Sequence, residues 1–318
     1  MNPTPPERPN QPNALAEIFL NDEGLRPIWS LILFLAIRAL LRLILFPIAL
    51  FLFPALPPAN HLISARTEYI FESATLLSIL AATWLMSKLE SRPISAYGFN
   101  SHRILRNFLT GLTTGASLLS LLIFSLHRLH LLTFDARLLS GTRILHFALV
   151  WALGFLLVAL AEESFLRAYL QFTLTRALIP IFHRLTPPRA QASAFWTSAL
   201  LLSLTFGALH RNNPGESPIG LIAATLVALI FCLSLWRTGS LWWAIGFHTA
   251  WDWAQSFLYG VPDSGLLIQG HLFATHPSGR TILSGGLTGP EGSALIFPIL
   301  LLACATVLLT SPPRRVSF

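Results

Sequence analysis

Two adjacent carboxylates and an arginine interrupt an apolar run in the segment Ala161-Glu162-Glu163-Ser164-Phe165-Leu166-Arg167. The run before it, residues 147–160, is long enough to lie in a bilayer, where one charged residue costs on the order of 3 kcal/mol. Glu163 and Arg167 are four residues apart with the acid first, the favourable order for an ion pair on one helical face. Glu162 points about 100° away and has no local partner. A paired carboxylate beside an unpaired one allows two identical groups to take different roles.

Three further polar residues interrupt apolar segments: His210 ends one, and His248 and Asp252 lie in another. The spacing of His248 and Asp252 puts both on one helical face. Small residues near them allow helices to approach closely, as a packed polar site requires: Gly207, Ala208, Gly246 and Ala250. Two imidazoles and two or three carboxylates on three helices therefore indicate either a hydrolytic centre or a metal site.

Each of these features also has a purely structural explanation. The Glu163–Arg167 pair could be an ion pair at a helix end, and Glu162 a loop-facing acid beyond a helix that ends early. His210 could cap a helix at the membrane interface, and His248 and Asp252 could satisfy one another inside a core. All four explanations must hold together to remove the site, so the joint functional interpretation is the stronger one.

The three motifs resemble the CPBP family of intramembrane proteases, which includes relatives of the CAAX prenyl endopeptidase Rce1 and bacteriocin self-immunity proteins. They are Glu162-Glu163-Ser-Phe-Leu-Arg167, Phe206-Gly-Ala-Leu-His210 and His248-Thr-Ala-Trp-Asp252. Their order and separations fit the family, and the resemblance covers roughly residues 145–258.

The resemblance implies that Glu162 activates water together with His210. It also implies that His248 and position 252 stabilise the oxyanion, while Glu163 and Arg167 brace the site. Asp252 stands where the prenyl protease has asparagine, and an ionised aspartate cannot donate to an oxyanion. Asp252 must then be protonated, orient His248 through its ring N–H, or ligate a metal.

The mechanism has two alternatives at this point. In one, a divalent metal such as Zn²⁺ is held by Glu162, His210, His248 and Asp252, and it activates a bound water. In the other, Glu162 is a general base without metal. The sequence has no His-Glu-x-x-His signature, and we favour the metal-free version.

The composition indicates the kind of protein that must position these residues. Hydrophobic residues make up 53% of the 318 residues and charged residues only 11%, against about 25% in soluble domains. The arginines are scattered between apolar runs, which indicates membrane topology rather than a nucleic-acid surface. Cys232 and Cys304 both lie in apolar segments, which argues against a disulfide framework and against a thiolate nucleophile.

We predict an all-α, polytopic transmembrane bundle with its active site inside the bundle. About eight apolar segments have roughly membrane length: residues 28–53, 66–86, 105–126, 145–166, 192–210, 219–236, 241–258 and 294–309. The site residues share one cavity only if their helices tilt, start late or are shortened. Arg38 and Arg42, in the first segment, either snorkel or pair within the bundle.

The chain divides into four predicted parts. Residues 1–25 form a polar, proline-rich tail without the pattern of a cleaved signal peptide, and residues 26–140 form the N-terminal helices. Residues 141–260 form the CPBP-like core. Residues 261–318 contain a loop and a final helix; we expect the loop, residues 260–291, to be an external flap with little regular structure.

Positive charge sets the predicted orientation. With both termini on one side, that side receives thirteen of the 21 lysines and arginines and the other side six. The positive-inside rule then places both termini in the cytoplasm.

The sequence therefore predicts an intramembrane endopeptidase of a bacterial cytoplasmic membrane, with a membrane-embedded or lipid-anchored peptide as substrate. Two other classes remain open. A transporter would use the buried charges as an ion relay, but it predicts internal repeats, which we do not find. A non-catalytic immunity or scaffold protein would keep its phenotype when Glu162 is replaced by alanine.

Overall fold

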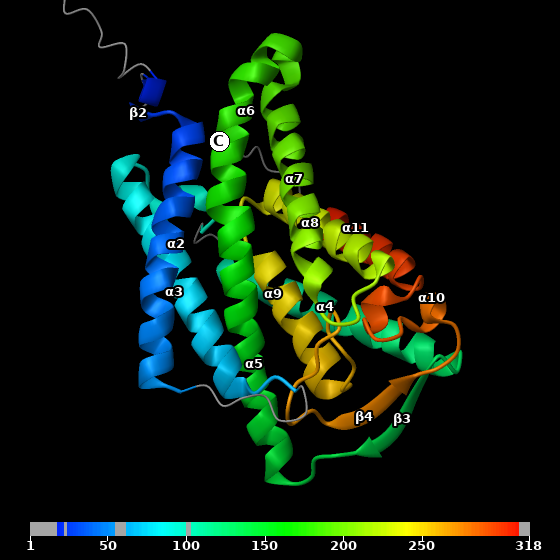
Figure 1. Cartoon of the computed structure of the whole chain (residues 1–318). Helices are drawn as coiled ribbons and strands as arrows, with labels where there is room; N and C mark the ends of the chain where they lie inside the picture. The colour runs from blue at the N-terminus through cyan, green and yellow to red at the C-terminus, as the bar shows by residue number, and fades with distance from the viewer. Residues whose placement is uncertain (1–17, 22–23, 55–61, 100–102, 312–318) are drawn as a thin grey trace, which may run out of the picture.

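Long apolar helices form the framework of the protein in the computed structural model, which describes residues 18–21, 24–54, 62–99 and 103–311 (Figure 1). Six helical runs in these residues are long and apolar enough to cross a membrane. They are α2 (Pro27–Leu52), α3 (Ala65–Leu89), α4 (Ile104–Arg128), Thr142–Leu185, Pro187–Asn212 with α7 (Ala190–Leu209) at its centre, and α8 (Pro218–Thr238). The predicted fold class, a polytopic helical bundle, is confirmed.

The fourth run is much longer than the predicted segment 145–166. It joins α5 (Thr142–Glu163), the π-helical turn η3 (Ser164–Leu170) and α6 (Gln171–Leu185) into 44 continuous residues. At ~1.5 Å per residue it is roughly 66 Å long, about twice the hydrocarbon thickness of a bilayer. Its α6 end therefore projects with α7 at one end of the molecule (Figure 1).

Two of the eight predicted segments are short helices. Segment 241–258 becomes α9 (Trp242–Asp252), followed by the π-helical turn η6 (Trp253–Leu258). Segment 294–309 becomes α11 (Ile296–Thr310), with 15 residues. Both fall short of the ~20 residues of a full crossing. The sequence analysis expected the site residues to share one cavity only if their helices tilt, start late or are shortened. The helix α9 is shortened in this way.

Close backbone approach places α9 in the middle of the bundle. A Cβ atom on Gly246 of α9 would lie 2.2 Å from the carbonyl oxygen of Phe108 on α4, and one on Gly111 of α4 would lie 2.0 Å from that of Trp243. The predicted role of Gly246 in close packing is therefore confirmed. Gly207 has the same role on α7, where a Cβ would lie 2.2 Å from Oγ1 of Thr225 on α8.

Residues 260–291, which we call the strap, are more ordered than predicted. They contain β4 (Phe273–Pro277) and the short helix α10 (Thr281–Ser284), and η7 (Pro290–Gly292) begins at their end. Strand β4 pairs antiparallel with β3 (Leu132–Arg137), which the sequence analysis did not predict. The expectation of little regular structure was wrong, because one half of the strap pairs with β3 (Figure 1).

A buried polar cluster connects the N-terminal helices to the long fourth run by hydrogen bonds. Tyr97, in the turn η2 (Ile94–Tyr97), and Tyr169 of η3 each donate a hydrogen bond of 2.7 Å to Glu90. Arg38 of α2 lies over the ring of Phe165, also in η3, at 4.3 Å. Arg38 therefore packs on an aromatic ring of the fourth run.

Little of the predicted tail lies within the described residues. Leu20–Asn21 (β1) pairs antiparallel with Gly24–Leu25 (β2), just before α2. The rest of the tail, residues 1–17 and 22–23, lies outside the described part of the chain, as does most of the proline-rich connection after α2.

Candidate active site

A cavity of about 320 Å³ opens between α3, α5, α7, α8, α9 and the strap. Its lining contains all four residues predicted to act in the chemistry: Glu162, His210, His248 and Asp252. Since these residues come from three separate helical runs, the packing of the bundle brings together what the sequence separates by up to 90 positions.

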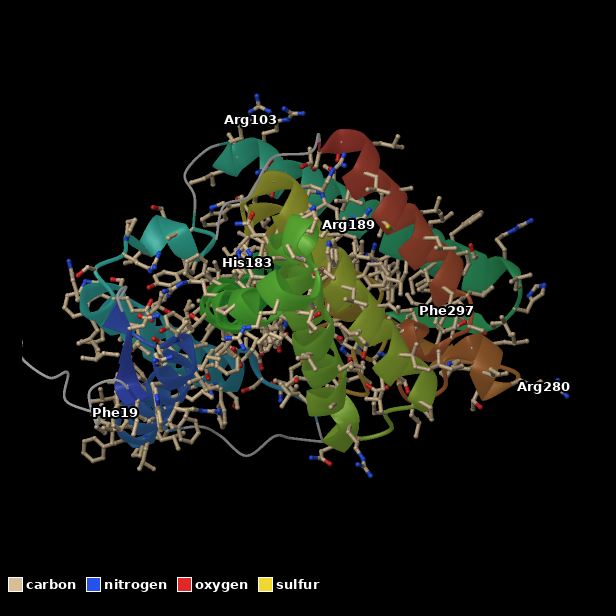
Figure 2. The ribbon with its side chains drawn as sticks, turned by 90° about the horizontal axis from the view of Figure 1, so that it is seen from above. Phe19, Arg103, His183, Arg189, Arg280 and Phe297 are labelled. Atoms are coloured by element: carbon tan, nitrogen blue, oxygen red, sulfur yellow. The ribbon has the colours of Figure 1, made fainter. Side chains whose placement is uncertain are left out.

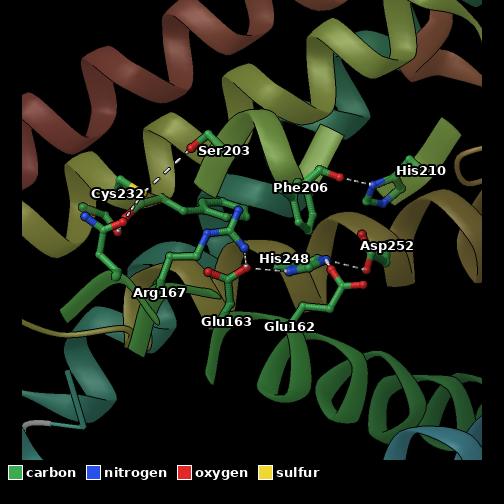
Figure 3. A network of polar contacts seen from close by, with 12 residues as sticks. Glu162, Glu163, Arg167, Ser203, Phe206, His210, Cys232, His248 and Asp252 are labelled. Atoms are coloured by element: carbon green, nitrogen blue, oxygen red, sulfur yellow. Dashed lines mark hydrogen bonds and ion pairs between the residues drawn. The ribbon is translucent and has the colours of Figure 1, made fainter. Parts of the chain in front are cut away.

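His248 lies at the centre of the site and faces three carboxylates. Its Nδ1 lies 3.1 Å from Oε1 of Glu163, and its Nε2 lies 3.3 Å from Oδ2 of Asp252 and 3.7 Å from Oε2 of Glu162 (Figure 3). A carboxylate only accepts hydrogen bonds, so a ring protonated on both nitrogens satisfies this arrangement. The predicted pairing of His248 with Asp252 on one face of α9 is present.

The two adjacent glutamates have different environments. The side chain of Glu163 is fully buried, whereas 36% of the Glu162 side chain is exposed and lines the cavity. Glu162 is thus accessible to water and substrate, and Glu163 is not. This difference follows from their positions on one helix, about 100° apart.

Arg167 holds Glu163 in place from one turn further along. Its guanidinium lies 2.9 Å from Oε1 of Glu163, and both side chains are buried. The guanidinium also lies over the rings of Phe206, at 4.4 Å, and Phe231, at 5.5 Å. Because the same Glu163 oxygen faces His248, the pair fixes the orientation of the imidazole.

His210 contributes its second ring nitrogen to the cavity. Its Nδ1 lies 2.8 Å from the carbonyl oxygen of Phe206, one turn earlier, as Figure 3 shows. A carbonyl oxygen can only accept, so Nδ1 carries the proton and donates. In the neutral ring Nε2 is then a free acceptor, suitable for binding a water molecule.

Both site helices continue as π-helical turns directly after their functional residues. The turn η3 begins after Glu163, and η6 begins after Asp252. π-Helical turns inside α-helices are rare and frequently occur at functional sites. Here each turn shifts the following residues around the helix axis while the run continues unbroken.

Four further acids, which the sequence analysis did not single out, line the cavity. They are Glu68 and Glu72 of α3, and Asp263 and Glu291 at the two ends of the strap. The four-residue spacing of Glu68 and Glu72 within a predicted apolar segment was a usable signal. For Asp263 and Glu291 the sequence holds no such signal, because loop residues have no periodicity.

The arrangement does not fit the metal-ion alternative. Among the described residues, no group of three or more His, Cys, Asp or Glu side chains is arranged to hold a metal ion. Each nitrogen of His248 already faces a carboxylate, and Nδ1 of His210 faces a backbone carbonyl. We therefore derive no chemical step through a metal.

Fold and site together describe a multi-pass membrane protein with a cavity lined by polar residues inside its helical bundle. Residues 144–254 match the family model described as type II CAAX prenyl endopeptidase Rce1-like. Neither a curated protein nor a solved structure gave a significant match.

The match confirms the resemblance carried by the three motifs: residues 144–254, about a third of the chain, are similar to this family. It supports a CAAX-type intramembrane protease as the general class of the protein. The matched part contains all six predicted site residues, from Glu162 to Asp252, and ends before the strap.

Proposed function

We propose that this protein is an intramembrane endopeptidase that hydrolyses a peptide bond of a membrane-embedded or lipid-anchored substrate, with Glu162 activating the attacking water. The observation that carries the proposal is the position of Glu162. It is the partly exposed member of a carboxylate pair, it lines a cavity inside an apolar bundle, and it lies 3.7 Å from His248.

The first step is attack of water on the scissile carbonyl. Glu162 takes one proton from the water as general base, and Nε2 of neutral His210 accepts a hydrogen bond from the same water. Oxygen bonds to the carbonyl carbon, and the carbonyl electrons move to the oxygen and form an oxyanion. Glu162 then returns its proton to the leaving nitrogen as the carbon–nitrogen bond breaks.

His248 is the group that stabilises the oxyanion in this proposal. Its Nε2 contacts of 3.3 and 3.7 Å are long compared with the ~2.7–2.9 Å of a strong charge-assisted hydrogen bond. The Nε2–H group therefore has no strong hydrogen-bond acceptor in the free enzyme and can donate to an oxyanion instead. Of the three roles considered for Asp252, this geometry favours orienting His248 through its ring N–H.

The test is cleavage by the purified protein reconstituted into vesicles. The probe is a farnesylcysteine peptide followed by three residues, chosen because the matched family is described as CAAX prenyl endopeptidases. We expect the tripeptide to be released, detected by mass spectrometry, and we expect His210→Ala to lower kcat by about 10²-fold or more, the size of a general acid–base contribution. No cleavage by folded wild-type protein would contradict the proposal.

The metal-dependent alternative predicts a different result. It requires about one zinc per purified chain, lost in both Glu162→Ala and His248→Ala, as expected for a catalytic metal site with these ligands. We expect instead that protein dialysed against a chelator keeps its activity. A loss of activity restored by zinc would contradict the metal-free mechanism.

A further inference from the structure

The cavity is strongly acidic, although the chain as a whole is basic. Six of the fourteen Asp and Glu residues line it, whereas no lysine or arginine among the described residues does. The formal net charge of the chain is +7. Catalysis as proposed uses Glu162 and Asp252, so four carboxylates at the cavity have no assigned role.

Two of these carboxylates are brought to the cavity by the strap. Glu291 is held there, because Trp251 Nε1 donates to its Oε1 at 2.9 Å and Ser264 Oγ to its Oε2 at 3.1 Å. Asp263 lies in the same lining. Burial, with Asp252 and Glu291 nearby, raises the pKa of Asp263 well above its usual range. A cation placed beside Asp263 would relieve this repulsion.

A buried hydroxyl next to these acids has no partner. Ser256 lines the cavity one turn after Asp252, its side chain is fully buried, and its Oγ makes no hydrogen bond within the described part of the protein. The residue before Asp263 is bound to the turn that contains Ser256, because Nε2 of Gln255 in η6 donates a hydrogen bond of 2.9 Å to the carbonyl oxygen of Pro262. An unpaired buried polar atom is costly, and the Ser256 oxygen can accept a hydrogen bond from an N–H group of a ligand.

The chemistry of the ligand follows from these groups. It must carry positive charge and several N–H donors, which lysine and arginine side chains provide. A metal ion is disfavoured, because the described residues offer no cluster with metal-binding geometry. A peptide substrate supplies such a side chain next to its scissile bond.

We propose that the substrate places a lysine or arginine side chain against Asp263, Glu291 and Ser256, beside the catalytic residues. This inference rests on the proposed peptidase function and names a feature of its substrate. All three residues lie after residue 254, outside the segment that matches the family model.

The experiment compares lysine with norleucine, which has a neutral side chain of similar length. Farnesylcysteine peptides carry one or the other at each of the three positions before and after the farnesylcysteine, and kcat/KM is measured for wild-type protein in vesicles. At one position we expect lysine to be favoured by about tenfold, the effect of one charge-assisted hydrogen bond. The Asp263→Asn variant should lower this ratio to about two.

Asp135→Asn is the matched control. It makes the same carboxylate-to-amide change on β3, where Asp135 is exposed and lies 2.8 Å from His276, outside the cavity lining. This variant should keep the wild-type preference for lysine. Equal kcat/KM for lysine and norleucine at every position, in an active wild-type enzyme, would overturn the subsite while leaving the peptidase function intact.

Direct binding separates this inference from the proposed function. If no peptide is cleaved, the proposed function fails, and binding of the fluorescently labelled lysine and norleucine peptides to the folded protein still tests the subsite. Tighter binding of the lysine peptide, lost in Asp263→Asn, supports it. Equal binding of both peptides overturns it.

Discussion

The adjacent residues Glu162 and Glu163 show how one helix gives two carboxylates different environments. Glu163 is buried between Arg167 and His248 and determines the position of the imidazole, whereas Glu162 faces the cavity. The sequence predicted this division from the four-residue spacing of Glu163 and Arg167 alone. It could be predicted because a charged residue in an apolar helix needs a partner, and helical geometry leaves few candidates.

We predict that Arg167→Ala destabilises the protein by on the order of 3 kcal/mol, because it leaves Glu163 buried without its cation. The measurement is thermal or denaturant unfolding in detergent. The double variant Arg167→Ala/Glu163→Gln should recover part of the loss, since no buried charge is then stranded. An Arg167→Ala protein with wild-type stability would show that the pair contributes nothing.

At the scale of elements, the position of α9 depends on glycine. A methyl group on Gly111 would lie 2.0 Å from a backbone oxygen of α9, which no rotamer change can relieve. We predict that Gly111→Ala lowers stability by roughly 1–3 kcal/mol, the usual cost of overpacking, and lowers activity as α9 shifts.

Gly154→Ala is the control for this prediction. It also lies inside an apolar helix, but its added Cβ would approach only side chains, the nearest being Trp151 at 3.3 Å. The better helix propensity of alanine should leave this variant as stable as wild type or more so. Equal effects of the two substitutions would contradict the packing argument.

The strap is the element that sequence analysis described least well. Its strand β4 is short and pairs with β3, more than 130 residues earlier in the chain. No local sequence pattern predicts a pairing over this distance. The acids Asp263 and Glu291 reach the cavity only because this pairing, and the bridge between Ile63 and Ile268, fix the path of the strap. The helices, in contrast, were predictable because their periodicity and apolar length are local properties.

The raised pKa of Asp263 predicts a pH dependence of stability. The groups that face it are Asp252 and His248 of α9, Glu162 of α5, and Glu291. The folded state holds the Asp263 proton more tightly than the unfolded state does. Stability should therefore fall as pH rises from roughly 4, the usual aspartate value, until the folded-state pKa is passed.

The difference in unfolding temperature between wild type and Asp263→Asn, followed over pH, isolates this contribution. We expect Asp263→Asn to gain stability relative to wild type as pH rises, because the amide does not ionise. A difference that is independent of pH would show that Asp263 is not perturbed in the folded protein.

At the scale of the whole molecule, the described residues contain six helical runs long enough to cross a membrane and two shorter helices, α9 and α11, on which the predicted topology also depends. Positive residues are distributed over the periphery rather than in one patch; Arg103 and Arg280, for example, project outward at separate edges (Figure 2). The run Thr142–Leu185 is roughly twice as long as the hydrocarbon layer of a bilayer is thick, so it extends beyond that layer.

We predict that both termini lie in the cytoplasm, from the excess of positive residues on that side. Fusion of a fluorescent protein or of alkaline phosphatase to either end checks this. Both ends should give fluorescence and no phosphatase activity. Phosphatase activity at only one end would mean that α9 or α11 does not complete a crossing.

The most direct test of the account is peptide cleavage by two variants of the adjacent glutamates, Glu162→Gln and Glu163→Gln, measured beside their unfolding temperatures. We predict that Glu162→Gln keeps wild-type stability and loses activity by about 10³-fold or more, as expected for removal of a general base. Glu163→Gln should lower both stability and activity, because it disturbs Arg167 and His248 together. Unaltered cleavage by folded Glu162→Gln protein would contradict the assignment of Glu162 as the residue that activates water.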